Sequence, residues 1–458
     1  MSIRIDKCHA FGMEKVRTAP KQVMPKLYLN NTLIPQIKLQ ESFTYLGKHF
    51  DFEMTSNKHK TSLLDNLKRM LQTIDALPLH PRNKIKLYQQ YILPKLSWDL
   101  TISDISVTWV KQALDPLLSS RIRQWLEIPI NGTLDILSLT KSKYGIGLIT
   151  IANRFLQCQV TMRNCMKNSK NADIRKIHEV TNKGANIKID TFTSTQAIIK
   201  ELRNDNVEKI TQLSSQSLVV KSIWNYTMKT TISIWQKVLQ KLPRNIYSFT
   251  LRYLNNTLAN GTNMLKWGRA TSSLCTACTN PQTLGHVMGG CKVHLKEKRY
   301  NYRHDSVLLN VIKVLDTCDG IDLYGDLPTY KNPSIVTGDN FRPDIVFLKE
   351  NKLYIIELTV GFETNIEINT QNKEKRYRPL ITPLLQTYEI VYVNLSMGAI
   401  GTFGKSCSNF KSTLSAAGLD ASEITFLLIK IVNVCIRTSY YIFCMRNKKW
   451  DAIELMTW

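Results

Sequence analysis

The 458-residue chain has few acidic residues for its number of basic ones. Asp and Glu number 36 against 61 Lys and Arg, which gives a formal net charge of +25 at pH 7. Such an excess repels itself and favours a polyanionic partner, most simply a nucleic acid. The alternatives are a well-solvated basic surface and a membrane-surface protein. Because the charge is spread along the chain and not concentrated in a tail, we expect a long nucleic-acid-binding channel.

The sequence also lacks a recognisable signal peptide and an uninterrupted membrane span. Its first ten residues carry charged side chains and have no apolar core, so they do not predict a secretory signal. The most apolar long stretch, residues 424–443, is interrupted by Lys430, Asn433 and Arg437. We therefore expect a buried helix there, and no membrane partner.

The ten cysteines do not have the spacing of a secreted disulfide scaffold. Seven are scattered, which fits a reducing interior: Cys8, Cys158, Cys165, Cys318, Cys407, Cys435 and Cys444. The other three form, with one histidine, the series Cys275-x2-Cys278-x7-His286-x4-Cys291. Zinc prefers four tetrahedral thiolate and imidazole ligands, so this spacing predicts a structural Zn²⁺ site. A chance cluster, or a disulfide between two of these cysteines, is the alternative.

The apolar pattern divides the chain into regions without an internal repeat. Residues 1–55 contain short β-like runs at 26–29 and 43–46, broken by prolines. Residues 56–255 have mostly helical periodicity, and within them 168–220 is polar and predicts weakly packed helices or a linker. The helical stripes are Leu63, Leu64, Leu67, Met70, Leu71 and Ile74, followed by Ile85, Leu87, Tyr88, Tyr91 and Ile92. Residues 300–458 have the pattern of a mixed α/β domain.

Two acids stand on what the sequence predicts to be a tight β-hairpin. The runs 344–349 and 353–360 are apolar and rich in β-branched residues, and the polar residues between them predict a turn. If the loop has an even number of residues, Asp344 pairs with Glu357 on one face. Their Cβ atoms would then be about 4.5 to 5.5 Å apart, close enough for both carboxylates to hold one hard cation. An odd loop would break this pairing.

The strand around Glu357 is apolar on both faces, so a charge at this position needs a partner or a metal ion. The alternative is that Asp344 merely opens a strand and Glu357 is an exposed edge residue.

The order of these motifs resembles the carboxyl-terminal part of site-specific non-LTR retrotransposon polyproteins, which carry a reverse transcriptase followed by a restriction-like endonuclease. The resemblance covers essentially the whole chain. It is carried by a basic helical region, the Cys-Cys-His-Cys knuckle, Arg303-His304-Asp305, Arg342-Pro343-Asp344 and Glu357-Leu358-Thr359. Residues 5–8 resemble the lysine-bearing palm motif, 43–47 the primer grip and 79–96 the start of the thumb.

The resemblance implies a multidomain α+β protein with a mainly helical basic thumb and linker region. A remnant of the reverse transcriptase palm would occupy residues 1–55, a thumb-like helical region 56–165 and a helical linker 166–266. A small CCHC zinc knuckle would follow at 267–294. The carboxyl-terminal domain, residues 300–458, would be an α/β restriction-endonuclease-like domain of the PD-(D/E)xK type.

A polymerase needs aspartates that bind two metal ions, and the family carries two adjacent ones on a turn. This chain has no Asp-Asp pair, and the match begins after that turn. We therefore do not expect the chain to copy RNA by itself.

The family pattern assigns nuclease roles to individual residues. Asp344 and Glu357 would bind Mg²⁺. The position two residues after the second acid, usually Lys in such nucleases, is Thr359 here. The family is similar in this departure and takes its lysine from the following helix, where Lys373 lies four residues before Tyr377 and on the same face.

The roles of other residues near these motifs have alternatives. Lys375 and Arg376 are alternatives to Lys373 as the basic residue of the nuclease site. All three side chains could instead be ordinary phosphate contacts. Asp305 and Ser306 directly precede an apolar helical run, so we expect a helix N-cap at Asp305. An accessory metal-binding role for Asp305 and a proton-shuttle role for His304 are the functional alternatives.

The resemblance implies a Mg²⁺-dependent DNA endonuclease that nicks target DNA so that the exposed end primes reverse transcription. Target DNA would be the main partner, the RNA of the element a second one, and the location nuclear. The alternative is a non-catalytic nucleic-acid-binding remnant of a truncated element.

Overall fold

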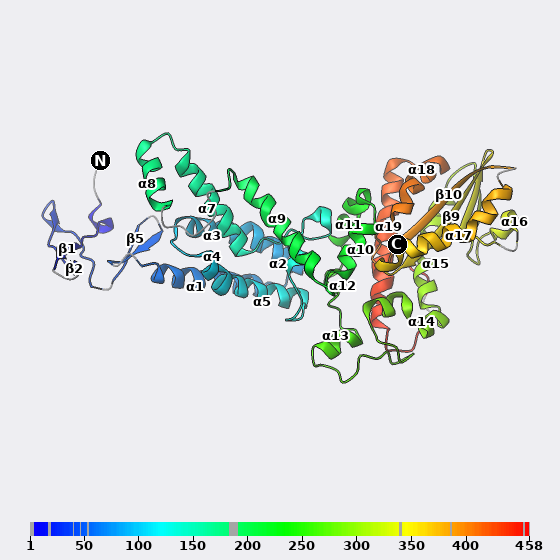
Figure 1. The fold of residues 1–458 in the computed structure, drawn as a ribbon, viewed down its shortest axis with the longest axis horizontal. Coiled ribbons are helices and arrows are strands. Elements are labelled where there is room, and N and C mark those ends of the chain that lie inside the picture. Colours follow the sequence, from blue (N-terminus) through cyan, green and yellow to red (C-terminus); the bar gives the residue numbers. More distant parts are fainter. Residues whose placement is uncertain are drawn as a thin grey trace. The chain divides into compact units, whose positions relative to one another are not determined.

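The computed structural model describes residues 4–16, 20–39, 41–45, 47–52, 55–182, 191–338, 341–384, 387–451 and 454–457 (Figure 1). The chain forms two compact units, residues 1–122 with 149–202 and residues 123–148 with 203–458. Of the three boundaries between the units, the first falls inside α5 (Asp115–Leu126) and the last inside α9 (Thr195–Gln212). This division is coarser than the five regions expected from the sequence, whose boundaries remain predictions.

The first unit combines short hairpins with a helical part. Its strands are β1 (Gly12–Lys15), β2 (Pro20–Val23), β3 (Tyr28–Leu29), β4 (Thr32–Leu33), β5 (Phe43–Tyr45) and β6 (Lys48–Phe50). Its helices, besides parts of α5 and α9, are α1 (Asn57–Ala76), α2 (Pro81–Leu87), α3 (Leu93–Ile102), α4 (Val107–Trp109), α7 (Ile151–Lys167) and α8 (Ala172–Asn182). The expected strands at 26–29 and 43–46 correspond to β3 and β5, although Leu46 lies outside the described residues.

The helical stripes predicted for this unit are largely confirmed. In α1 the structure buries Leu63, Leu67, Leu71 and Ile74, which recur every three to four residues along one face. Tyr91 was expected in the core but is exposed. A π-helical turn, Tyr88–Ile92, adds a residue between α2 and α3, and this shift in periodicity turns Tyr91 outward while Tyr88 and Ile92 stay buried.

The second unit contains a four-stranded sheet and the helices around it. Its strands are β7 (Asp322–Gly325), β8 (Ile345–Lys349), β9 (Lys352–Gly361) and β10 (Glu389–Gly398). Its helices from residue 123 to 296 are α6 (Asp135–Ser138), α10 (Leu218–Tyr226), α11 (Ile232–Leu239), α12 (Arg244–Leu254), α13 (Gly261–Lys266) and α14 (Lys292–Lys296). Those that follow are α15 (Arg299–Leu315), α16 (Ser334–Thr337), α17 (Ile366–Leu384), α18 (Phe410–Ala417) and α19 (Ala421–Cys444). The mixed α/β pattern expected for residues 300–458 is thus observed.

The sheet order is β10-β9-β8-β7. Strand β8 runs antiparallel to both of its neighbours, whereas β10 runs parallel to β9. Antiparallel neighbours need only a tight turn, but the parallel pair requires a crossover, and α17 supplies it between β9 and β10. β9 has a partner strand on each side, and seven of its ten residues are buried while the other three are partly buried.

The predicted hairpin register is confirmed. Lys349 pairs with Lys352 and Ile345 with Ile356, so the loop has the two residues Glu350 and Asn351. Glu350 takes a left-handed conformation, with φ of 56°, as a two-residue hairpin turn requires. One step beyond Ile345 and Ile356, the same register places Asp344 opposite Glu357.

The apolar stretch near the end of the chain forms α19, which begins with a capping box made by Asp420 and Glu423. Among the described residues, α19 alone is long and apolar enough to cross a membrane by length and composition. However, 67% of its most apolar window is buried, and it packs against α15 and α11. Burial within the protein therefore accounts for its composition, as expected.

Candidate active site and metal centre

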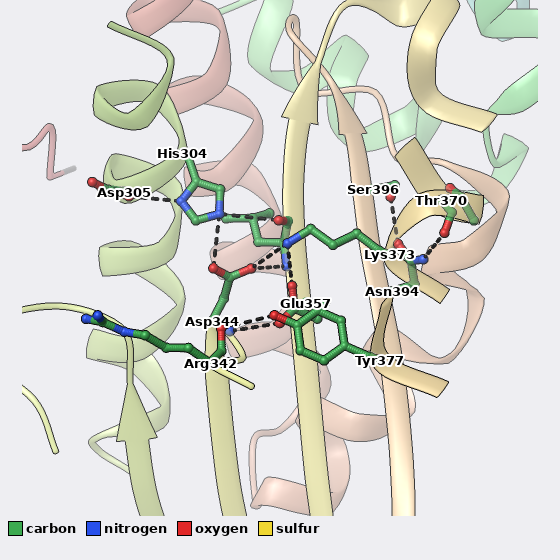
Figure 2. Close-up of polar contacts among 11 residues, drawn as sticks. His304, Asp305, Arg342, Asp344, Glu357, Thr370, Lys373, Tyr377, Asn394 and Ser396 are labelled. Carbon is green, nitrogen blue, oxygen red and sulfur yellow. Dashed lines mark hydrogen bonds and ion pairs between the residues drawn. The ribbon is translucent and has the colours of Figure 1, made fainter. Parts of the chain in front are cut away.

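Asp344 and Glu357 interlock at the end of the β8–β9 hairpin (Figure 2). The backbone N–H of Asp344 donates to Glu357 Oε1 at 3.2 Å, and the N–H of Leu358 donates to Asp344 Oδ2 at 2.8 Å. Asp344 is 8% exposed and Glu357 is fully buried. The exposed-edge alternative for Glu357 is therefore wrong, and the partner that a buried charge requires must be found within the structure.

That partner is Lys373, which reaches the acids from α17 (Figure 2). Its Nζ contacts Glu357 Oε2 directly and lies 3.6 Å from Asp344 Oδ2. The expected alternatives Lys375 and Arg376 are exposed, and Arg376 instead lies over the ring of Tyr377 at 5.4 Å. Of these three basic residues, the structure brings Lys373 to the acids.

Tyr377 stands one turn after Lys373, on the same face of α17, as expected. Its hydroxyl donates to the carbonyl of Arg342 at 3.0 Å, and its ring centroid is 5.8 Å from Lys373 Nζ. Arg342 in turn pairs with Asp326 at 2.5 Å. Tyr377 thus fixes α17 against the segment that leads into Asp344.

His304 approaches the acids from α15 (Figure 2). Its Nε2 lies 3.3 Å from Asp344 Oδ1 and 3.3 Å from the carbonyl oxygen of Leu358. Its Nδ1 is 2.9 Å from Asp305 Oδ1. The structure therefore brings His304 into contact with an acid of the pair, while Asp305 contacts the far side of the imidazole ring.

The expected N-cap at Asp305 is wrong, because α15 begins at Arg299 and Asp305 lies in its second turn. Contacts distant in the sequence fix the earlier start. The Arg299 guanidinium donates to the carbonyls of Met445 and Lys448, at 2.6 and 2.9 Å, and pairs with Glu297. These tertiary contacts override the local Asp-Ser signal for a helix start.

The charges around the acid pair shift one another's pKa values. Burial lowers the pKa of His304, but the Asp344 charge and hydrogen bonds to Asp305 and Asp344 outweigh it and raise this pKa to about 10. Burial acts to raise the pKa of Asp344, yet His304 and Lys373 hold it well below its usual range. Burial and the Asp344 charge raise the pKa of Glu357, against the opposing effect of Lys373. His304 is accordingly a cation at neutral pH.

Asn394, which the sequence reasoning missed, supports this arrangement from the neighbouring strand. It lies opposite Glu357 in the parallel register of β10 and β9. Its side-chain amide donates to the Thr370 carbonyl of α17 at 2.9 Å, and its Oδ1 accepts from the Ser396 hydroxyl at 2.6 Å (Figure 2). Asn394 therefore anchors α17 to the sheet one turn before Lys373. A polar residue within an apolar strand run was the available signal.

The predicted zinc ligands come together in the structure. The ligand atoms of Cys275, Cys278, His286 and Cys291 all lie within 4.8 Å of one another. Cys278 Sγ is 3.3 Å from His286 Nε2 and 3.6 Å from Cys291 Sγ. All ten cysteines are free thiols, so the disulfide alternative is wrong. A convergent Cys3His set can hold Zn²⁺, and we call it the zinc cluster below.

Replacing Cys278 by Ser is expected to remove the metal from the zinc cluster. The purified chain should carry about one zinc ion, because four soft ligands close a tetrahedral site, and the three remaining ligands should hold it poorly. Elemental analysis measures the metal, and nucleic-acid binding should weaken with its loss. Cys444→Ser, at an exposed cysteine outside the cluster, is the matched control. A zinc-free wild-type chain that still binds would contradict the assignment.

Comparison with known proteins gives a partial match. No family model matches the chain. Over 145 residues it is 24% identical to the Retrovirus-related Pol polyprotein from type-1 retrotransposable element R2 of Popillia japonica. This similarity supports a retrotransposon origin. The match covers 32% of this chain and 20% of that polyprotein, so the chain spans only a small part of its relative.

Proposed function

We propose that the chain is a Mg²⁺-dependent DNA endonuclease, part of a retrotransposon protein, that nicks target DNA to provide a primer for reverse transcription. The observation that carries this proposal is the convergence of two buried carboxylates, from adjacent antiparallel strands, on one ammonium group. A buried acid pair in contact with a lysine and a histidine is an arrangement suited to phosphodiester hydrolysis.

The donor set fits a hard divalent cation. Lys373 Nζ is reached by Asp344 Oδ2 and Glu357 Oε2 together, so the two carboxylates already meet at one positive charge. The carbonyl oxygen of Leu358 faces the same group of atoms, because His304 Nε2 lies 3.3 Å from both this oxygen and Asp344 Oδ1. Carboxylate and carbonyl oxygens are the ligands that Mg²⁺ prefers. When bound, Mg²⁺ would supply an activated water and stabilise negative charge on the phosphate.

The remaining side chains act on the charge and orientation of this site. Lys373 is placed to orient water or to offset the charge that develops on the phosphate. His304, whose Nε2 lies 3.3 Å from Asp344 Oδ1, is placed to orient that carboxylate. This role differs from the proton shuttle considered from the sequence. Arg342, with a side chain 57% exposed at the rim, can contact a phosphate.

The composition and the zinc cluster support nucleic acid as the partner. A formal charge of +25 attracts a polyanion, and zinc modules commonly present backbone and side chains to nucleic acid. Genomic target DNA would require a nuclear location, and the RNA of the element would be a second partner. Polymerisation is not part of the proposal, because no Asp-Asp pair is present in the sequence.

A second candidate function, nucleic-acid binding without cleavage, is favoured by the balance of charge at the acid pair. Lys373 and His304 together compensate Asp344 and Glu357, so the group is electrostatically satisfied without a metal ion. Nicking of supercoiled plasmid separates the two candidates. The proposed nuclease converts it to the open-circular form with Mg²⁺ and not with EDTA, whereas a binding remnant retards the plasmid and leaves it intact.

Replacing Lys373 by Met is expected to lower single-turnover nicking by about a hundredfold, the usual contribution of a positioned proton-transfer or charge-stabilising group. DNA affinity should fall only slightly, because one of many basic residues is lost. Lys375→Met removes an exposed charge from the same helix and is the matched control. Equal rates in the two variants would move the lysine role away from Lys373.

A further inference from the structure

A fully buried arginine, Arg303, ties three segments of the second unit together. One of its terminal nitrogens donates to the Ser439 hydroxyl of α19 at 3.2 Å. The other donates to the carbonyls of Met288 and Val360, at 2.9 and 2.8 Å. An arginine presents several donors in a fixed fork, so one guanidinium can satisfy carbonyls from separate segments.

The two carbonyls belong to the two sites described above. Met288 stands between His286 and Cys291, within the segment that supplies two ligands of the zinc cluster. Val360 lies in β9, three residues after Glu357. A single side chain therefore bridges the zinc cluster and the strand that carries an acid of the pair.

Tyr300 strengthens the hold of α15 on the zinc cluster. It precedes Arg303 by three residues and therefore lies on the same face of the helix. Its hydroxyl accepts from the Cys291 N–H and donates to the His286 carbonyl, both at 3.1 Å. Its ring centroid is 5.9 Å from the Arg303 guanidinium carbon. Tyr300 thus holds the segment 286–291 at both of its ends, and Arg303 holds it in the middle at Met288.

The next residue of the same helix reaches the acid pair. His304 contacts Asp344 and the Leu358 carbonyl, as described above. Successive residues of an α-helix point about 100° apart, since 3.6 residues make a turn. α15 therefore presents Arg303 to the zinc cluster and His304 to the acids.

Arg303 and a nearby buried acid interact electrostatically. Glu363 is fully buried, accepts from the Tyr253 hydroxyl at 2.5 Å and from the Ile400 N–H at 3.1 Å, and lies within the electrostatic range of Arg303. The two terminal nitrogens of Arg303 and their three acceptors form a hydrogen-bond network with a defined geometry.

We propose that Arg303 is a positioning residue that couples metal occupancy of the zinc cluster to the geometry of Asp344 and Glu357. Loss of zinc would release the segment around Met288, free the guanidinium, and loosen the end of β9. Zinc would then control cleavage without touching DNA or the acids. The consequence for cleavage rests on the proposed nuclease function, but the coupling itself does not.

Hydrogen exchange tests the coupling independently of activity. Zinc is removed from the full chain by a chelator, and exchange is followed for residues 357–361 of β9 and, as an internal reference, for β7 and β8. We expect exchange in 357–361 to become about tenfold faster, the scale on which groups that support metal sites act. Unchanged exchange there, or an equal rise in β7 and β8, overturns the proposal.

Two matched variants on α15 separate coupling from general stability. Arg303→Lys keeps the charge opposite Glu363 but loses the fork, so exchange in 357–361 should be faster than in the wild type and no longer respond to zinc. Arg299→Lys alters another buried arginine of the same helix, whose contacts are with Met445, Lys448 and Glu297, and should keep the zinc response. A normal zinc response in Arg303→Lys would refute the coupling.

Nicking by the same proteins completes the experiment. If the wild type nicks, zinc removal and Arg303→Lys should each slow single-turnover cleavage about tenfold, and together they should slow it no further. Multiplicative losses would contradict the proposal. If the wild type does not nick while exchange responds to zinc as expected, the proposed nuclease function fails and the coupling stands.

Discussion

Asp344→Asn and Glu357→Gln should each reduce Mg²⁺-dependent nicking by at least about a hundredfold, the usual loss when a group that stabilises the transition state is removed. Each substitution keeps the shape of the side chain and removes its negative charge. The two residues lie opposite each other in the hairpin and share Lys373 as a partner, so losing either charge leaves the other unable to hold a divalent cation by itself. The rate is measured on supercoiled plasmid under single-turnover conditions.

DNA affinity should stay within about a fewfold of the wild-type value in both variants, because the acids act on the transition state and would, if anything, repel a phosphate. Filter binding with Mg²⁺ omitted measures this affinity without cleavage and without removing zinc from the zinc cluster. Glu350→Gln, at the exposed turn of the same hairpin, removes a charge without touching the acid pair and should nick normally. Undiminished nicking by Asp344→Asn or Glu357→Gln would end the assignment of these residues.

The hairpin could be predicted from the sequence because side chains alternate between the faces of a strand with a fixed period of two. Once the turn is limited to an even loop, the register that pairs Asp344 with Glu357 is settled, and the observed pairing of Ile345 with Ile356 continues it. The zinc cluster could also be predicted, since four potential zinc ligands within seventeen residues leave few other arrangements.

The position of α15 could not be predicted, because contacts far along the chain determine it. The local Asp305-Ser306 pattern indicated a helix start, but Arg299 extends the helix backward through carbonyls of residues 445 and 448. That shift turns His304 toward Asp344 and Arg303 into the interior. A buried arginine with acceptors from three segments has no signature in a sequence, since two of its three acceptors are backbone carbonyls that any residue could provide.

The second large expected effect is a steep fall in DNA affinity as the salt concentration rises. If the basic residues follow a DNA backbone, each phosphate contact releases condensed counterions, and the logarithm of the affinity falls linearly with the logarithm of the salt concentration. A slope of roughly 0.9 per contact means that about six contacts lose about a thousandfold in affinity between about 50 and 200 mM salt. Titrations of a duplex at several salt concentrations, with Mg²⁺ omitted to prevent cleavage, measure this slope.

The slope should be steep on duplexes of unrelated sequence, because contacts with phosphates carry no sequence information. A chain that bound a membrane surface or an acidic protein through the same charge would not combine this slope with tight, sequence-tolerant binding to DNA. Because the chain has a formal charge of +25, a DNA partner must at least bind it at low salt. Binding to duplex DNA that does not respond to salt, or no binding at low salt, would therefore reject DNA as the main partner, and with it the proposal that Asp344 and Glu357 act on a phosphodiester.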